Sequence, residues 1–238
     1  MLLQIRRLSK SFGSLKAADG IDLAIARGDA VGIIGPNGAG KSTLFNLIAG
    51  ILAADAGQVL LDGADITHAS AHKRCRAGIG RSYQIPQPFE TLTVFENLLV
   101  AAIHGREKDE ADSIDFCAEI LERAGLMRRA NAMAGSLPLL ERKRLEMARA
   151  LATGPKVLLL DEIAGGLAES ECAELVTTIK DIRAAGTTIV WIEHIVHALL
   201  AVVDRLVVLN FGRKIAEGEP ATVMSSREVR EIYTGIAA

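Results

Sequence analysis

The sequence predicts an α/β fold with a mostly parallel sheet at its core, an antiparallel β subdomain at the N-terminus and an inserted α-helical subdomain. Three observations lead to this prediction. Continuous apolar runs recur at 30–35, 156–162 and 187–194, which is typical of parallel strands buried on both faces. Short alternating segments lie near the start of the chain, and apolar residues at helical spacing occur within 95–151.

The N-terminal part of the chain is expected to form strands with one exposed face. Residues 2–8 and 21–27 alternate like short strands, and 57–66 carries Asp62-Gly63 between two strand-like stretches. Alternation indicates a half-buried strand, and an Asp-Gly pair favours a tight hairpin turn. We therefore expect two strands followed by a hairpin.

The parallel core begins with a strand, a loop and a helix. Residues 30–35 are apolar and β-branched, and the helical pattern of 41–50 follows them, with Gly50 as its stop signal. A further strand pair is expected over 205–218, with its turn at residues 210–213.

Residues 95–151 are expected to be mostly helical. The apolar residues at helical spacing in the middle of this stretch are Ile114, Cys117, Ile120, Leu121 and Ala124. Gly125 follows them as a stop signal, and a second helix start is expected at 136–141, where Pro138 suits the first turn.

The chain has 238 residues, of which 50% are hydrophobic and 24% charged. This composition is ordinary for a globular protein, and the length can bury one large core. Because no repeat or low-complexity linker interrupts the chain, we expect a single domain over 1–238. Within it we expect a helical subdomain at about 85–152 and a C-terminal tail at about 220–238.

Charge and cysteine content argue against several classes of protein. A net charge of −2 gives no strong attraction to nucleic acid or to an anionic membrane. Cys75, Cys117 and Cys172 are far apart and form no metal or redox pair, so they are expected to be reduced thiols. No apolar run approaches the roughly 18 residues of a membrane span, and the N-terminus is charged too early for a signal peptide. We expect a soluble protein that reaches any membrane through a partner.

Residues 35–43, GPNGAGKST, fit the pattern G-x-x-x-x-G-K-[ST] at every position, between an expected strand and helix. Such a loop curls its backbone N–H groups round phosphate oxygens at the positive end of the helix. Lys41 would reach the β- and γ-phosphates, and Ser42 would hold Mg²⁺. The alternative is an ordinary glycine-rich turn. The context favours a P-loop NTPase core, with the nucleotide bound by Gly35, Pro36, Asn37, Gly38, Ala39, Gly40, Lys41, Ser42 and Thr43.

Two further strands end in residues suited to phosphate chemistry. Asp161 ends an apolar strand where a P-loop enzyme carries a Mg²⁺-coordinating carboxylate, and Glu162 follows as the candidate general base. The alternative is a strand closed by a capping acid. His194 ends the next such strand, which brings its imidazole toward the same γ-phosphate, whereas His197 is expected to be structural.

Taken in order, these motifs resemble those of ABC-transporter ATPase subunits over essentially the whole chain. Phe12, in KSFG, occupies the place of the aromatic residue that stacks on adenine in that family. Gln84, in RSYQIPQPF, occupies the place of the Q-loop glutamine, and His194 that of the switch histidine. A P-loop alone would leave many NTPases open, whereas this ordered set is specific.

The resemblance implies a subunit that binds and hydrolyses ATP with Mg²⁺. It assigns catalysis to Glu162, His194 and Gln84, and metal binding to Ser42, Gln84 and Asp161. It implies partnership with a second ATPase subunit and with membrane permeases, an indirect link to a solute-binding protein, and no nucleic acid. The expected location is cytoplasmic, peripheral on the inner face of the cell membrane.

Three short stretches narrow the resemblance. TVFENLLVAA, RKRLEMARALAT and VREIYTG are similar to the ATPases of branched-chain amino-acid importers and of their relatives for urea, amides and aromatic acids. The alternative is a soluble ABC ATPase of a non-transport assembly, such as iron–sulfur cluster biogenesis. Repair types need long coiled-coil insertions and translation types carry two ATPase halves, and neither is present. The surroundings of Gln84 and the YTG ending favour transport.

One family motif is altered. The family signature reads roughly L-S-G-G-Q and contacts the ATP held by the other subunit, and here the aligned residues are Leu137, Pro138, Leu139, Leu140 and Glu141. Proline has no hydroxyl donor, leucine side chains would crowd a phosphate, and a carboxylate would repel it. We therefore expect a degenerate signature and a heterodimer with two unequal sites. The alternative is a working variant, because the helix dipole survives these substitutions.

Two smaller changes agree with this interpretation. Ile163 and Ala168 stand where a proline and an aspartate are usual, and the loop that ends at Ala168 crosses the dimer interface in the family. Residues 84–105 are expected to dock the membrane partner through Ile85, Pro86 and Phe89. The alternative is that these residues pack the helical subdomain.

Overall fold

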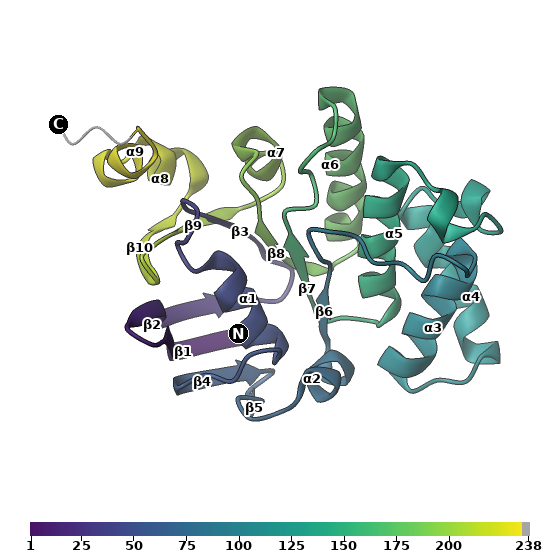
Figure 1. The fold of residues 1–238 in the computed structure, drawn as a ribbon, viewed down its shortest axis with the longest axis horizontal. Coiled ribbons are helices and arrows are strands. Elements are labelled where there is room, and N and C mark those ends of the chain that lie inside the picture. The colour runs from purple at the N-terminus through teal and green to yellow at the C-terminus, as the bar shows by residue number, and fades with distance from the viewer. Residues whose placement is uncertain (235–238) are drawn as a thin grey trace.

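A computed structural model describes residues 1–234 of the protein. Figure 1 shows sheet strands at the left and centre and a group of helices at the right. Within the described range, one sheet has the strand order β10-β9-β3-β8-β7-β6, and a second sheet has the order β2-β1-β4-β5.

The larger sheet is parallel except at one edge, as predicted. Its strands are β6 (Ile79–Arg81), β7 (Val157–Asp161), β8 (Thr188–Ile192), β3 (Ala30–Ile34), β9 (Arg205–Asn210) and β10 (Arg213–Gly218). The β9–β10 pair is antiparallel, and the other pairs are parallel. Every residue of β3, β7 and β8 is buried, which explains their continuous apolar sequences.

The smaller sheet is the predicted antiparallel β subdomain. It consists of β1 (Leu3–Phe12), β2 (Leu15–Ile25), β4 (Ala56–Leu61) and β5 (Ala64–Asp65). The hairpin at Asp62-Gly63 is confirmed, but the first two strands are longer than predicted. They pair across a two-residue turn at Gly13, with register shifts along β1. Irregular pairing of this kind breaks the alternation by which strand ends are recognised in a sequence.

The helical subdomain packs beside the larger sheet. Its helices are α3 (Val94–Arg106), α4 (Ala111–Arg123) and α5 (Leu139–Ala152), with short 3₁₀ turns at Met127–Arg129 and Ala134–Ser136. Figure 1 shows them together at the right of the molecule. Thr93 and Glu96 form a reciprocal capping box at the start of α3, and Gly125 lies in the left-handed region just after α4. The predicted helices and stop signal are confirmed.

The other helices flank the sheets and follow the strands. They are α1 (Lys41–Ala49), α2 (Ala71–Ala77), α6 (Glu169–Ala184), α7 (Val196–Leu200), α8 (Pro220–Ser225) and α9 (Arg227–Thr234). Gly50 ends α1 in the left-handed conformation, as predicted. Helices α2 and α6 and strand β6 were not predicted from the sequence. The end of the predicted C-terminal tail, 235–238, lies outside the described residues.

Successive residues of the parallel strands serve opposite cores. Ile33 packs with α1 and the antiparallel sheet, whereas Ile34 packs with the helical subdomain. Leu159 and Leu160 divide in the same way. Within the described residues, no helix has both the length and the apolar character needed to cross a membrane.

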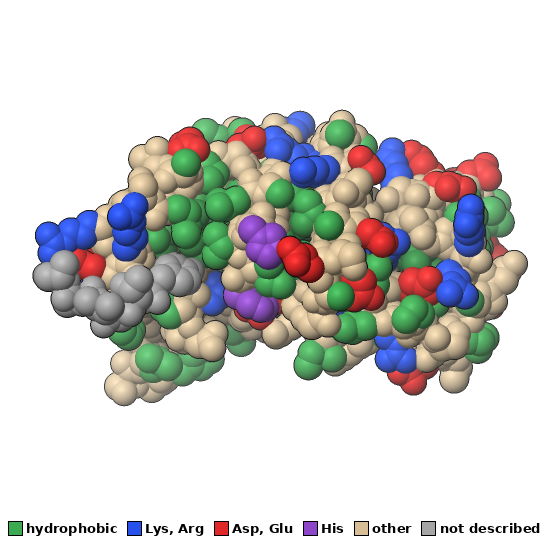
Figure 2. Space-filling model, turned by 90° about the horizontal axis from the view of Figure 1, so that it is seen from above, with side chains coloured by type: hydrophobic (Ala, Val, Ile, Leu, Met, Phe, Trp, Pro, Cys, Tyr) green, Lys and Arg blue, Asp and Glu red, His purple; other side chains and the backbone are tan. Residues whose placement is uncertain are grey.

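Seen from above Figure 1, one face of the molecule carries histidine and acidic side chains close together near its middle (Figure 2). Hydrophobic side chains gather beside them, and Lys and Arg are scattered among Asp and Glu. This mixed distribution of charge agrees with the net charge of −2.

Candidate functional site

A pocket of about 280 Å³ opens at the predicted P-loop. It is bounded by Phe12 and Leu15 from the antiparallel sheet, by residues 37–43, and by Glu162 at the end of β7. Phe12 is 48% exposed, so its ring is available at the pocket edge. The structure therefore places the aromatic residue, the loop and the acid round one cavity.

The loop backbone takes its shape from glycine. Gly40 has φ +98°, and a Cβ atom there would lie 2.1 Å from the carbonyl oxygen of Ala17. A larger residue would have to displace that strand. The Gly212 N–H donates to the Ala39 carbonyl at 3.0 Å, so the β9–β10 turn supports the loop from behind. The backbone is thus held in a turn whose N–H groups lie at the start of α1.

Lys41 is the first residue of α1, and its side chain bends back into the loop. Its ammonium donates to the carbonyls of Gly35 at 2.7 Å and Pro36 at 3.1 Å. Burial lowers the pKa of Lys41, while the charges of Glu162 and Asp161 raise it. The ammonium and the two acids therefore share one electrostatic environment.

Glu162 lies between the residues predicted to act with it. Its Oε2 accepts a hydrogen bond from the Gln84 amide at 2.8 Å, and it is 3.9 Å from His194 Nδ1. The Glu162 backbone has φ +45°, a conformation that is costly for a non-glycine residue and is found at functional sites. Since β7 and β8 are parallel neighbours, their carboxyl ends bring Glu162 and His194 together.

Glu193, which was not predicted as a site residue, holds His194 in place beside Glu162. Its buried carboxylate accepts from the backbone N–H groups of Ala164 and His194, both at 3.0 Å. Its Oε1 is 3.1 Å from His194 Nδ1. A second acid directly before the histidine was the available signal in the sequence. His197, in α7, takes part in none of these contacts.

Lys143 is a second residue that was missed. It is buried on α5, and its ammonium donates to the backbone carbonyl of Gln84 at 3.1 Å and to that of Glu162 at 3.5 Å. Burial lowers the pKa of Lys143, while the charges of Glu193 and Glu162 raise it. One ammonium thus ties the helical subdomain to both predicted catalytic segments. Nothing in the sequence near Lys143 distinguished it from an exposed helical lysine.

Asp161 also has an unpredicted partner. Its Oδ2 accepts a hydrogen bond from Arg81 at 2.8 Å, and both side chains are 8% exposed. The backbone N–H of Asp161 donates to the Ser82 hydroxyl at 3.3 Å. The strand that carries Arg81, β6, is the neighbour of β7 in the sheet.

The altered segment 137–141 begins α5, as predicted. Leu137 and Leu140 are buried, whereas Leu139 is 43% exposed. The Glu141 carboxylate accepts from Arg129 at 3.0 Å. The charge of Glu141 was expected to repel the partner's phosphate, but it is paired within the helical subdomain.

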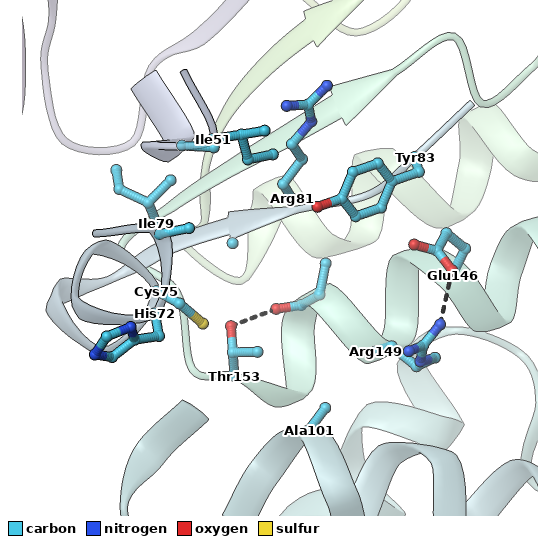
Figure 3. A pocket seen from close by; sticks show the side chains of 14 residues that line it. Ile51, His72, Cys75, Ile79, Arg81, Tyr83, Ala101, Glu146, Arg149 and Thr153 are labelled. Carbon is cyan, nitrogen blue, oxygen red and sulfur yellow. Dashed lines mark hydrogen bonds and ion pairs between the residues drawn. The ribbon is translucent and has the colours of Figure 1, made fainter. Parts of the chain in front are cut away.

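A second hollow, which we call the α2–α3 groove, lies between α2, α3, β6 and α5. Two adjoining cavities of about 310 and 280 Å³ form it. Both are lined by His72, Cys75, Ala101, Arg149 and Thr153. Figure 3 shows Tyr83 and Arg81 along one wall, with the Glu146–Arg149 ion pair opposite Cys75.

Comparison with protein families gives a match to the ABC transporter model over residues 18–165, well over half of the chain. The chain belongs to the ABC transporter family. Relatives span its whole length. The probable branched-chain amino acid transport ATP-binding protein LivG of Methanocaldococcus jannaschii is 36% identical, with 98% of this chain and 97% of that protein covered.

Other relatives of this ABC protein differ in what their names say they transport. The high-affinity branched-chain amino acid transport ATP-binding protein BraF of Pseudomonas aeruginosa is 34% identical, covering 99% of this chain and 98% of that protein. The lipopolysaccharide export system ATP-binding protein LptB of Haemophilus influenzae is 32% identical, covering 98% of this chain and 97% of that protein.

Solved structures agree with the predicted fold. The ADP conformation of an ATP-binding cassette from an ABC transporter matches with a TM-score of 0.90 at 36% identity, covering 99% of both chains. A nucleotide-free cassette from an ABC transporter matches with a TM-score of 0.89 at 34% identity, covering 100% of this chain and 99% of that chain. The protein is an ATP-hydrolysing ABC cassette with the P-loop NTPase fold.

Proposed function

We propose that this chain energises an ABC importer for branched-chain amino acids or for related amide, urea or aromatic-acid solutes. The observation that carries the proposal is similarity to LivG and BraF over nearly the full length of the chain. In addition, the residues proposed to act on the nucleotide bound by this chain's own P-loop are all present. The equally full-length similarity to LptB makes an exporter the second candidate.

The test is transport by the complex that forms round this chain. Membrane proteins that co-purify with it are reconstituted in proteoliposomes, and ATP-driven uptake of labelled leucine, acetamide, urea and benzoate is compared between the wild type and Glu162→Gln. Uptake of one solute by the wild type alone supports the importer. Co-purification without any multi-span membrane protein would favour the non-transport alternative, and lipopolysaccharide extraction would favour the exporter.

In the proposed site, the adenine stacks on Phe12 and the phosphates lie against residues 35–43, with Lys41 at the β- and γ-phosphates. Glu162 is the general base that takes the proton of the attacking water. Gln84 holds the Glu162 carboxylate through the 2.8 Å hydrogen bond. His194, 60% exposed and held by Glu193, faces the γ-phosphate.

The donors of Ser42, Gln84 and Asp161 suit Mg²⁺, which prefers hydroxyl, amide and carboxylate oxygens. The Gln84 amide nitrogen donates to Glu162, and within residues 1–234 the Gln84 amide oxygen makes no hydrogen bond, which leaves it available to a metal. Arg81 occupies Asp161 Oδ2, and Oδ1 has no hydrogen-bond partner among the described residues. When bound there, Mg²⁺ would neutralise charge that develops on the phosphate.

The α2–α3 groove is the proposed docking site for a permease helix. Exposed apolar side chains favour docking over internal packing. Phe89 and Tyr83, which line the groove, are 47% and 45% exposed, and Ile85, on the same segment but outside the groove lining, is 72% exposed. The Gln87 segment next to them is held by Arg149 and Glu146 of α5. A helix seated there would rest on the same segment that carries Gln84. Docking would also place the cassette at the cytoplasmic face of the membrane.

Disulfide crosslinking tests the docking site. Because native Cys75 lies in the groove, single cysteines are introduced at Gln87 or Glu90 in a variant that lacks Cys75, Cys117 and Cys172. A cysteine at Asp112, on α4, is the control. Crosslinks to the permease from 87 or 90, but not from 112, support docking. No crosslink from either position in an assembled transporter would contradict it.

The proposed assembly is a heterodimer with two unequal ATP sites. The side that serves this chain's own nucleotide has its P-loop, acids, glutamine and histidine in place. The side that would serve the partner's nucleotide begins α5 with Pro138 and leucines, and lacks the usual aspartate at Ala168. We assign this second role to the helical subdomain at about 85–152, within a single domain of residues 1–238 that ends in a tail from about 220.

A further inference from the structure

Arg81 occupies an unusual place between the two hollows of the molecule. It lines the α2–α3 groove, and its guanidinium bonds Asp161 Oδ2 at 2.8 Å. A second guanidinium nitrogen donates to Asn46 Oδ1, on α1, at 2.6 Å. The side chain therefore joins β6 to the carboxylate that ends β7 and to the helix that follows the P-loop.

The guanidinium is held tightly in this position. It lies over the Tyr83 ring with 5.0 Å to the ring centroid, and over the Phe45 ring with 5.7 Å. Figure 3 shows Arg81 and Tyr83 side by side on the groove wall. Stacking on aromatic faces favours a planar guanidinium over a lysine ammonium. Few other orientations are open to a side chain that is 8% exposed and has partners on several sides.

The pairing fixes which oxygen of Asp161 is used, and for what. With Oδ2 on Arg81, only Oδ1 stays free, and the Asp161 charge acts on the Lys41 ammonium in the P-loop. Groups that hydrogen-bond a metal-binding carboxylate orient it, and their removal typically costs about 10–100-fold in metal affinity or activity.

We infer that Arg81 is a positioning residue for the nucleotide-bound metal: it holds Asp161 so that Oδ1 faces the P-loop. The inference rests on the metal site of the proposed function. In this role Arg81 contacts neither the nucleotide nor the metal and acts only through Asp161. A cation that merely competed for Asp161 would have the opposite effect, because its removal would strengthen metal binding.

The test measures metal affinity without turnover. Mn²⁺ is titrated into the purified chain with saturating ADP and followed by electron paramagnetic resonance. Arg81→Met is expected to weaken Mn²⁺ binding about 10-fold, and Arg81→Lys to recover part of the loss. Binding of fluorescent ATP in EDTA should stay within about twofold. Arg183→Met, which breaks an Arg–Asp pair with Asp204 at the surface, is the matched control and should bind Mn²⁺ like the wild type.

Unchanged or tighter Mn²⁺ binding by Arg81→Met would overturn the inference, even if the variant were less stable to heat. If Arg81→Met does not fold, Asn46→Ala is tested in its place, because it removes the second hydrogen-bond partner of Arg81. Mn²⁺ affinity is then expected to fall about threefold, less than when Arg81 itself is removed. Unchanged Mn²⁺ affinity would again overturn the inference. Failure of the wild type to bind Mn²⁺ with ADP would instead contradict the proposed metal site.

Discussion

The P-loop side and the α5 side of this cassette form their local structure equally well but differ in the polar groups they offer. On the P-loop side, Lys41 and Glu162 border the pocket, each with a hydrogen-bonded partner. At the start of α5, Pro138 has no N–H, Leu139 is exposed, and Glu141 is bound to Arg129. The helix still begins at Leu139, with Pro138 as its capping residue. Local folding of α5 therefore does not require serine or glycine at these positions, and we expect their absence to affect only chemistry on a partner's nucleotide.

The reason lies in what each segment packs against. Leu140, which is aligned with a glycine of the family signature, lies in the apolar core of the helical subdomain beside Leu137, so this change favours burial. In the P-loop a Cβ at Gly40 would collide with Ala17, so folding and phosphate binding impose the same residue there. The two sides can therefore change independently, and variants on each side test the difference between them.

The largest effect is expected from Lys41→Ala. Removing the one ammonium within the loop takes away charge-assisted hydrogen bonds worth about 1.5–3 kcal/mol each, so ATP affinity should fall at least about 10-fold and turnover should vanish. Fluorescent-nucleotide binding and phosphate release measure both. Lys156→Ala, which removes a surface pair with Asp62, is the control. Normal turnover by Lys41→Ala would remove that lysine from the site.

Glu162→Gln should separate binding from hydrolysis. The amide oxygen can still accept from Gln84, but the side chain cannot take a proton from water, so kcat should fall about 10²–10⁴-fold with ATP binding intact. Single-turnover phosphate release and nucleotide binding provide the measurement. If the variant hydrolyses ATP at the wild-type rate, the general base is another group.

Restoring the signature should raise the activity of the α5 side. The purified chain alone is expected to hydrolyse ATP weakly, because a homodimer would put the altered segment at both sites. Loss of one preorganised donor lowers the rate about 10²–10³-fold, so placing Ser-Gly-Gly-Gln at positions 138–141 should raise the ATPase rate of the chain at least about 10-fold. Steady-state ATPase activity and its dependence on protein concentration measure this.

Because Leu140 is buried, glycine at that position also opens the core. Pro138→Ser with Leu139→Gly changes only the capping residue and an exposed side chain, and it serves as the milder variant, with thermal unfolding as the check on folding. Robust, cooperative hydrolysis by the unmodified homodimer would show that the segment is a working variant.

Glu141→Gln should have the smallest effect. Its Oε1 is paired with Arg129, whose side chain is 52% exposed while that of Glu141 is 22% exposed, and Oε2 has no hydrogen-bond partner among the described residues; a pair that is open to solvent on one side contributes about 0.2–1 kcal/mol. ATPase activity should therefore change by less than about fivefold, and the free energy of unfolding by less than about 1 kcal/mol. A large rise in activity from this change alone would show that the carboxylate, rather than the proline and leucines, impairs the signature.

Much of this protein could be predicted from sequence because the relevant causes are local. Apolar runs predicted β3, β7 and β8, since a strand buried on both faces can tolerate few polar residues. The P-loop followed from its glycines and lysine within nine consecutive residues. Glu162 and His194 were found because parallel strands of one sheet end at the same edge.

Other features depend on which strand lies beside which, and only the tertiary structure decides that. Arg81 meets Asp161 across 80 residues of chain because β6 is the neighbour of β7. Lys143 reaches Gln84 and Glu162 because α5 packs behind both. A charged side chain on a short strand or an amphipathic helix has the same local pattern whether it faces water or a buried partner. Its partner is set by the strand order and by helix packing, which no short window of sequence contains.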